Sequence, residues 1–166
     1  MESLPFALQP PDPRLSIRPV EMTDIGQLHA ICWPERPYIA IYQLVARAVK
    51  YMRQRRGLGV VVEADGYLRA FGQLTLWPRG GEISDLMVAE NYRSRGIGAG
   101  MIQYLIQAAI DMRVPNVEIG AAFSNPLALA LYRRLGFQDD RTVMMNLGNG
   151  RESVLYLRIE LPRRLV

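Results

Sequence analysis

A glycine-rich segment at residues 93–100 constrains this sequence more than any other feature. It follows an apolar, strand-like stretch at residues 82–88 and precedes a helix-like stretch at residues 98–112. Glycine lets the backbone turn tightly and lets a ligand approach the amides, and a helix N-terminus presents free N–H groups. The segment therefore predicts a phosphate or pyrophosphate site, to which two arginines add charge. It reads Arg93, Ser94, Arg95, Gly96, Ile97, Gly98, Ala99, Gly100.

Three known kinds of glycine loop can be compared with this segment. The Walker loop ends in Gly-Lys-Ser/Thr, which is absent here. The dinucleotide loop Gly-x-Gly-x-x-Gly has its third glycine one residue later than Gly100. The pattern Gln/Arg-x-x-Gly-x-Gly/Ala is matched at every fixed position, by Arg93, Gly96 and Gly98. The third pattern is therefore favoured.

A second block, at residues 125–137, predicts a short helix. Asn125 is a favoured N-cap, Pro126 suits the first helical position, and Gly136 suits the C-terminal end. With the glycine loop, this block resembles the GCN5-related N-acetyltransferase (GNAT) family, in which the pattern is Asn-x-x-Ala-x-x-Leu-Tyr-x-x-x-Gly-Phe. Here the small residues fall at 128 and 130. An opening Ile17-Arg18-Pro19 followed by Asp24 is also similar to the family.

Periodicity and turn residues predict a mixed α/β chain. Helices are expected at residues 24–31, 38–55, 98–112 and 126–135, and strands at 15–18, 58–63, 67–76, 82–88, 116–121, 142–147 and 154–161. These elements should form a central sheet of about six to seven strands with helices on both faces, and the unit at 82–121 should be a right-handed parallel crossover. The resemblance implies the GNAT fold, with parallel strands that splay apart at the cofactor site. The proline-rich residues 1–13 are expected to be an extended arm, and residues 14–166 a single domain.

The resemblance also implies a cosubstrate, acetyl-coenzyme A, and places it. Its pyrophosphate would lie on the amides of the glycine loop, and its pantetheine arm would pair with the backbone of Leu86, Met87 and Val88. Asn125 would contact the coenzyme. Tyr132 would lie near the sulfur and protonate the departing thiolate, since a tyrosine with a pKa near ~10 stays protonated at neutral pH.

The resemblance implies that the amine attacks the thioester directly, without a covalent enzyme intermediate, so a carboxylate that removes the amine proton is useful. Glu82 resembles the base of histone-acetylating relatives in its spacing from Arg95. Asp85 is the rival, and a bulge in this strand would change which face each occupies. In the ribosomal-protein branch the base lies five residues before the asparagine, where this chain has Gly120, with Glu118 two residues away.

Composition excludes several other classes of function. Cys32 and His29 are the sole cysteine and histidine, so neither an internal disulfide nor a Cys/His metal site is expected. The net charge is +4 with scattered arginines, which does not favour nucleic acid. No signal-like or membrane-spanning stretch is seen, so a cytoplasmic location is expected.

The function expected is transfer of an acetyl group to a primary amine of a small molecule or peptide. Homodimers are frequent in the family, and a second copy of this chain is a possible partner. The alternative is a GNAT-like module that binds acyl-CoA without catalysis. The acceptor cannot be identified from the sequence.

Overall fold

The structure is a computed structural model that describes residues 15–148 and 150–163, so the arm expected at residues 1–13 lies outside the described part. The strands are β1 (Ser16–Pro19), β2 (Gly57–Ala64), β3 (Tyr67–Trp77), β4 (Gly80–Val88), β5 (Asn116–Ala122), β6 (Gln138–Asn146) and β7 (Arg151–Glu160). The helices are α1 (Ile25–Cys32), α2 (Tyr38–Arg53), α3 (Ile97–Asp111) and α4 (Pro126–Arg134), with short 3₁₀ turns η1 (Met22–Asp24) and η2 (Glu90–Tyr92).

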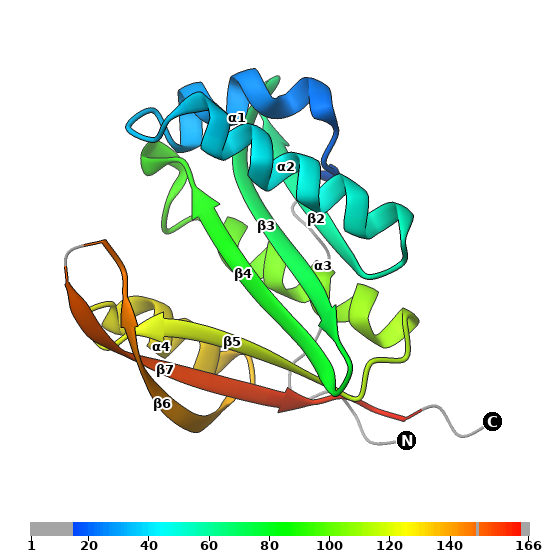
Figure 1. Ribbon diagram of the computed structural model, residues 1–166, viewed down its shortest axis with the longest axis vertical. Coiled ribbons are helices and arrows are strands. Elements are labelled where there is room, and N and C mark those ends of the chain that lie inside the picture. Colours follow the sequence, from blue (N-terminus) through cyan, green and yellow to red (C-terminus); the bar gives the residue numbers. More distant parts are fainter. Residues whose placement is uncertain (1–14, 149, 164–166) are drawn as a thin grey trace.

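The strands form one seven-stranded sheet in the order β1-β2-β3-β4-β5-β7-β6. The β4–β5 pair is parallel, and the other neighbouring strands are antiparallel. Helices α1 and α2 cover one face of the sheet, whereas α3 and α4 lie on the other (Figure 1). The predicted mixed α/β sheet with helices on both faces is confirmed.

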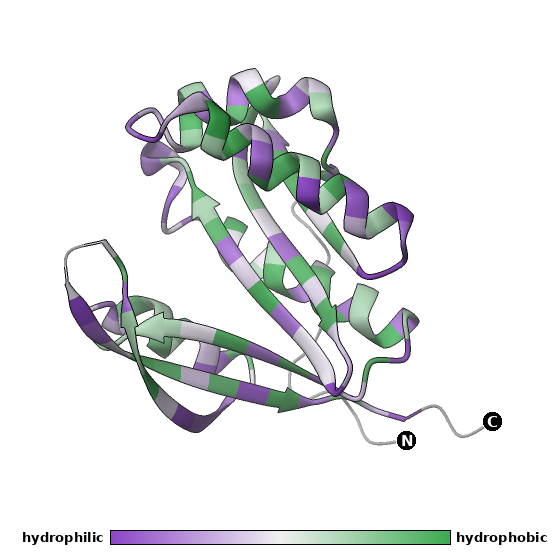
Figure 2. Cartoon of the chain, viewed as in Figure 1, coloured by the Kyte–Doolittle hydropathy of each residue, from purple (hydrophilic) through white to green (hydrophobic). Residues whose placement is uncertain are grey.

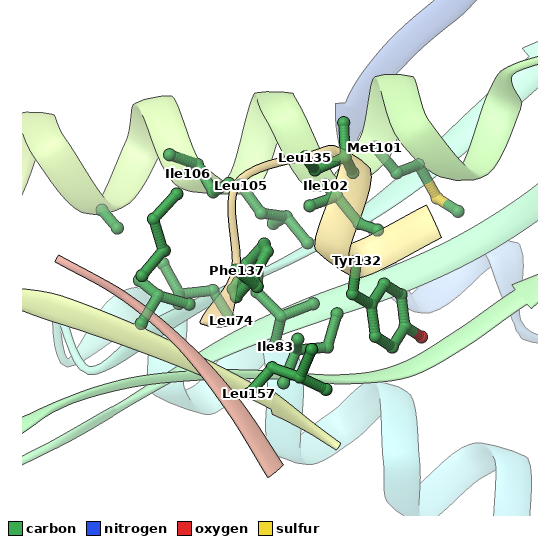
Figure 3. Packing of buried hydrophobic residues seen from close by; sticks show 14 of the residues in the cluster. Leu74, Ile83, Met101, Ile102, Leu105, Ile106, Tyr132, Leu135, Phe137 and Leu157 are labelled. Carbon is green, nitrogen blue, oxygen red and sulfur yellow. The ribbon is translucent and has the colours of Figure 1, made fainter. Parts of the chain in front are cut away.

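Each face of the sheet has its own hydrophobic cluster. On the α3 side, the apolar stripe of α3 packs on β3, β4 and β5 together with residues of α4, and Figure 3 shows Leu105, Ile83 and Phe137 among them. On the other side, the apolar stripe of α2 and that of α1 pack on β2 and β3 around Phe71. Figure 2 shows α2 with alternating apolar and polar segments, as expected for a helix that covers a sheet.

The parallel pairing of β4 with β5 is short. It joins Gly81–Ile83 to Val117–Ile119 and then ends, and the two strands diverge towards the left of Figure 1. The buried Asn116 fixes the closed end, because its Nδ2 donates to the carbonyl of Arg79 at 3.1 Å. A Cβ on Gly80 would collide with the same amide. The predicted splay of the parallel strands is therefore present.

β4 contains a bulge opposite β3. The register passes from Phe71↔Met87 to Gln73↔Ser84, so two residues of β4 oppose one of β3. Asp85 has φ 54°, in the left-handed region that aspartate tolerates better than most residues. The bulge anticipated at this strand is confirmed.

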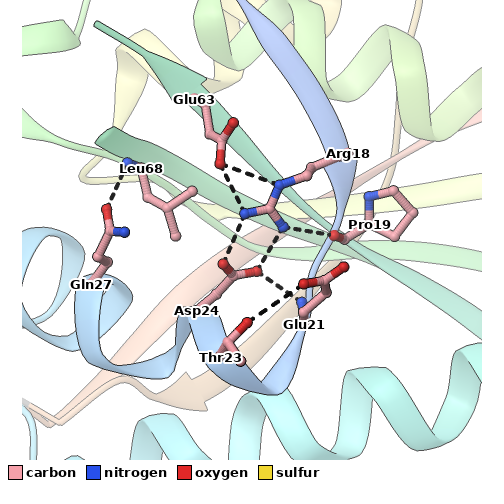
Figure 4. A network of polar contacts seen from close by, with 8 residues as sticks. All are labelled: Arg18, Pro19, Glu21, Thr23, Asp24, Gln27, Glu63 and Leu68. Atoms are coloured by element: carbon pink, nitrogen blue, oxygen red, sulfur yellow. Dashed lines mark hydrogen bonds and ion pairs between the residues drawn. The ribbon is translucent and has the colours of Figure 1, made fainter. Parts of the chain in front are cut away.

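An ion-pair network joins β1 to η1 and β2 (Figure 4). The Arg18 guanidinium donates to both carboxylate oxygens of Asp24 at 2.8 Å and to Glu63 at 2.9 Å. Burial favours the neutral form of Asp24, but the hydrogen bonds from Arg18 and from the Glu21 amide outweigh it and lower the pKa of Asp24. The Asp24 carboxylate is thus engaged by Arg18 and the Glu21 amide, and it makes no cap hydrogen bond to α1.

Some boundaries differ from those expected. β6 begins at Gln138, before the expected residue 142. The sequence did not indicate this start, because the first residues of β6 are polar and exposed and show no alternating pattern. α2 ends at Arg53, and Arg55 follows at φ 56°, which stops the helix before the expected residue 55. Gly136, at φ 97°, follows α4 as expected.

Candidate functional site

The N-terminus of α3 presents a group of free backbone amides. Gly96, at φ 79°, turns the chain into the helix, and the amide of Gly100 donates to its carbonyl at 2.9 Å. Within the described chain, the amides of residues 97–99 have no backbone acceptor, and no side chain caps the helix. A Cβ on Gly96 or Gly100 would meet nothing within 4 Å. There is thus free space beside these two glycines, and free amides at a helix N-terminus suit an anionic group.

The two loop arginines are held differently from each other. Arg93 folds back on β4, and its Nε donates to the carbonyl of Val88 at 3.0 Å. Arg95 lies over the ring of Tyr92 with its guanidinium 4.9 Å from the ring centre, and Arg69 lies 4.4 Å from the same ring. Arg93 thus fixes the end of β4, while Arg95 keeps its charge beside the free amides.

The residues expected to pair with a pantetheine arm lie at the diverging end of β4. The amide of Ala89 donates to the carbonyl of Arg69 at 2.7 Å, which makes these two a hydrogen-bonded pair. Such pairs alternate along an antiparallel ladder, so Met87 exchanges bonds with Phe71, while Val88 directs its N–H and C=O away from β3. Leu86 is the second residue of the bulge. Beyond Ile83 this edge of β4 has no pairing with β5.

Tyr132, on α4, is buried at 7% exposure at the edge of the α3-side cluster. Its ring lies 6.4 Å from that of Phe137, and its hydroxyl points away from Phe137 (Figure 3). No hydrogen bond to that hydroxyl is found among the described residues. Burial raises the pKa of Tyr132 to about 12, so the phenol is neutral at physiological pH. Asn125 caps α4, and its Oδ1 accepts from the amide of Ala128 at 3.3 Å.

Carboxylates lie on the opposite, open face of the sheet. Glu82 and Glu118 are register partners on β4 and β5. Glu82 accepts from Nε1 of the exposed Trp77 at 3.0 Å. Glu118 is held by both guanidinium nitrogens of Arg141, at 2.7 and 3.1 Å. Glu82 thus has a neutral partner, whereas the charge of Glu118 is matched by a cation.

Tyr156, on β7, is a further candidate residue that sequence reasoning did not single out. It pairs with Gly120, and a Cβ on that glycine would lie 3.1 Å from the Tyr156 ring, so the ring fills the space of the absent side chain. Arg141 lies over the ring at 4.6 Å. Burial and the nearby Glu82 carboxylate raise the pKa of Tyr156. The feature that brings Tyr156 next to Gly120 is the register between β5 and β7, which a single sequence does not reveal.

Other chemistries have little support in the part of the chain that the structure describes. Within it, no group of three or more His, Cys, Asp or Glu side chains could hold a metal ion. Burial raises the pKa of the Cys32 thiol to about 11, so it is a poor nucleophile. No described helix has the length and apolar character needed to cross a membrane.

Comparisons with known proteins agree with this arrangement. The model of the acetyltransferase (GNAT) family matches residues 22–137. An N-alpha-acetyltransferase of Sulfurisphaera tokodaii is 24% identical over 156 residues, which cover 84% of this chain and 89% of that protein. The N-alpha-acetyltransferase MAK3 of Arabidopsis thaliana is 42% identical over 57 residues, which are 34% of this chain and 30% of that protein.

Solved structures show the same fold. The RimL ribosomal L7/L12 alpha-N-protein acetyltransferase in complex with coenzyme A has a TM-score of 0.79 at 12% identity, covering 92% of this chain and 97% of that one. A spermidine N-acetyltransferase chimera from Vibrio cholerae and hSSAT has a TM-score of 0.74 at 21% identity, covering 89% and 95%. Since the family model spans well over half of the sequence, the chain belongs to the GNAT family of acetyltransferases.

Proposed function

We propose that this protein is an acetyl-CoA-dependent N-acetyltransferase that acetylates a primary amine by direct attack in a ternary complex. The proposal rests on three features near the diverging end of the β4–β5 pair, which is called the seam below; residues of all three elements meet in the α3-side cluster. These are the free amides at the start of α3, the end of β4 that does not pair with β5, and the hydroxyl of Tyr132, which has no partner among the described residues.

The residues of the seam fit the cosubstrate. The amides at the start of α3, close to Arg95 in the loop, suit a pyrophosphate, and the N–H of Val88, which faces away from β3, suits an extended amide chain such as pantetheine. Acetyl-CoA, when bound, supplies an activated acetyl group as a thioester. Leu86, Met87, Val88, Asn125 and the loop at residues 93–100 are proposed to hold it.

Two groups of the chain are proposed to move protons. Tyr132 offers its hydroxyl proton to the departing thiolate, and its raised pKa keeps that proton in place until the sulfur becomes basic. Glu82 accepts the proton of the acceptor ammonium, directly or through water. It suits this role better than Glu118, because Arg141 binds both oxygens of Glu118.

The acceptor is proposed to approach over the open sheet face that carries Glu82 and Tyr156. The relatives named above act on protein N-termini or on spermidine, and both are primary amines. This agreement supports a primary amine as the acceptor without choosing between a peptide and a small molecule.

The test has a binding stage and a turnover stage. The binding stage measures thermal unfolding with coenzyme A, acetyl-CoA, NAD and ATP. Only the two coenzyme A forms should stabilise the protein, by about 3 kcal/mol at a ligand concentration a hundred times the Kd. Thiol release should then follow with a panel of peptides, polyamines and aminoglycosides. A shift with NAD alone would overturn the proposal. Coenzyme A binding without turnover on any amine would favour an acyl-CoA-binding module.

A further inference from the structure

Asp85 is the first residue of the β4 bulge, and its carboxylate accepts hydrogen bonds from both strands. The amide of Gln73 donates to its Oδ2, and the Ser84 hydroxyl donates to the same oxygen at 3.2 Å. Gln73 is itself 6% exposed, so its amide needs a partner. From this we infer that Asp85 is a positioning residue, and that Gln73 and Asp85 together lock the bulge that orients the acyl-carrying end of β4.

The bulge decides which way each following residue faces. Ile83, Leu86 and Val88 pack on the α3-side cluster, while Met87 packs on the cluster under α1 and α2. Regular alternation from Ile83 would put Met87 on the α3 side and reverse its neighbours. A slip of one residue would therefore exchange which backbone groups meet β3 and which face the seam.

Three local features permit this geometry. Asp85 adopts φ 54°, which only glycine, asparagine and aspartate adopt readily. Gly72 lies opposite, where a Cβ would collide with the Leu86 side chain, so the position has room for Leu86 to turn inward. Gln73, directly opposite Ser84, supplies the donor that fixes the aspartate.

The hydrogen bonds from Gln73 and Ser84, here called the lock, give Asp85 a structural role that is distinct from proton transfer. Its Oδ2 accepts two hydrogen bonds, and their donors belong to the residues that flank the bulge. Asp85 thus acts through backbone conformation, while Glu82 remains the carboxylate for the amine proton. This inference rests on the proposed function for its consequence in turnover, but not for its consequence in coenzyme binding.

The experiment compares Asp85→Asn, Asp85→Gly and Asp85→Ala, each measured for the Kd of acetyl-CoA, for kcat, for the pH profile of kcat/KM, and for Tm. Asparagine keeps both the acceptor oxygen and the left-handed tolerance, and glycine needs no lock. These two should retain activity within about threefold, whereas alanine should lose about tenfold, because it strains at positive φ. The acidic limb of the pH profile should stay the same in all three.

Gln73→Leu removes the donor at similar volume and should behave like Asp85→Ala. Gln73→Leu also leaves the Asp85 carboxylate without its donor from β3. It is therefore paired with the double variant Gln73→Leu/Asp85→Gly. The double variant should recover towards Asp85→Gly, since a glycine bulge does not depend on the lock. Additive losses in the double variant would contradict the proposal.

Equal losses in the asparagine, glycine and alanine variants, with loss of the acidic limb, would identify Asp85 as the base and overturn the inference. Full activity in all of them, Gln73→Leu included, would also overturn it. If the wild-type protein binds acetyl-CoA but acetylates no amine, the proposed function fails while the Kd ranking still tests the lock.

Discussion

Tyr132 is the residue whose surroundings most restrict its chemistry. Its ring is buried, its hydroxyl has no partner in the part of the chain that the structure describes, and burial raises its pKa to about 12. A group in this state can donate a proton but does not ionise at neutral pH. Tyr132→Phe should therefore lower kcat by about 10²-fold or more, with little change in the KM for acetyl-CoA.

The measurement is thiol release at saturating acetyl-CoA. Tyr104→Phe serves as a control, since that tyrosine is exposed on α3, and its rate should equal that of the wild type. An unchanged kcat in Tyr132→Phe would remove the hydroxyl from the reaction.

The same burial predicts a stability effect at alkaline pH. The pKa of Tyr132 is higher in the folded state than its ordinary value of 10, so the neutral ring stabilises the fold fully below pH 10. This contribution, on the order of 2–3 kcal/mol, is lost as the pH rises from about 10 to about 12. Tm against pH should fall more steeply over this window in the wild type than in Tyr132→Phe. Parallel curves would contradict the assignment.

Glu82→Gln should lower kcat/KM and abolish its acidic limb, because the amide cannot accept the amine proton. The matched variant is Glu118→Gln, at the register partner of Glu82, whose carboxylate is bound by Arg141. It should keep the acidic limb. The reverse pattern in the two pH profiles would make Glu118 the base.

Local sequence patterns predicted the roles of residues that act on their chain neighbours, but not those of residues that act across the sheet. The caps of α4 and the glycine turn into α3 depend on neighbours in the chain, and these were confirmed. The ring of Tyr156 over Gly120 depends on the register between two strands far apart in sequence. The hydrogen bond from Arg93 Nε to the carbonyl of Val88 likewise depends on the folded loop, and no local pattern indicated it.

At the scale of elements, the start of α3 carries the clearest prediction. Gly96→Ala places an L-residue at φ 79° and puts a methyl group beside the free amides. Stability should fall by about 1 kcal/mol, and the Kd for coenzyme A should rise. The control is Gly66→Ala in the β2–β3 turn, which has the same φ of 79° and the same open surroundings.

Calorimetric titration and thermal unfolding of the two variants separate strain from binding. Both variants should lose similar stability, and only Gly96→Ala should weaken coenzyme A binding. Equal Kd values in the two would show that the loop amides do not contact the ligand.

The elements themselves were largely predictable, because amphipathic stripes and turn residues are local signals. The predicted helix at α3 is present, and its apolar stripe packs in one cluster; the Asp65-Gly66 turn between β2 and β3 has positive φ at both residues. β6 began earlier than expected, because edge strands with exposed polar residues lack the alternation that marks a buried face.

At the scale of the molecule, the two arms of the sheet meet at one short parallel ladder, and Asn116 closes it. Asn116→Ala should lower the free energy of unfolding by about 1–3 kcal/mol, because it removes the hydrogen bond from the buried Asn116 side chain to the carbonyl of Arg79. Denaturant unfolding measures this loss. Asn146→Ala, on the exposed β6, is the comparison and should change stability by less than about 0.5 kcal/mol. Equal losses would show that the ladder does not depend on the amide.

The strand order carries a consequence for synthesis on the ribosome. β7 lies between β5 and β6, so β6 has no strand to pair with until residues 151–160 have left the exit tunnel. The nascent chain can assemble β1 to β4 with α1, α2 and α3, but it must hold β5 and β6 as open edges meanwhile. Tyr156, on β7, therefore joins the sheet last, and a ribosome stalled before residue 151 would display the N-terminus of α3 before Tyr156 is present.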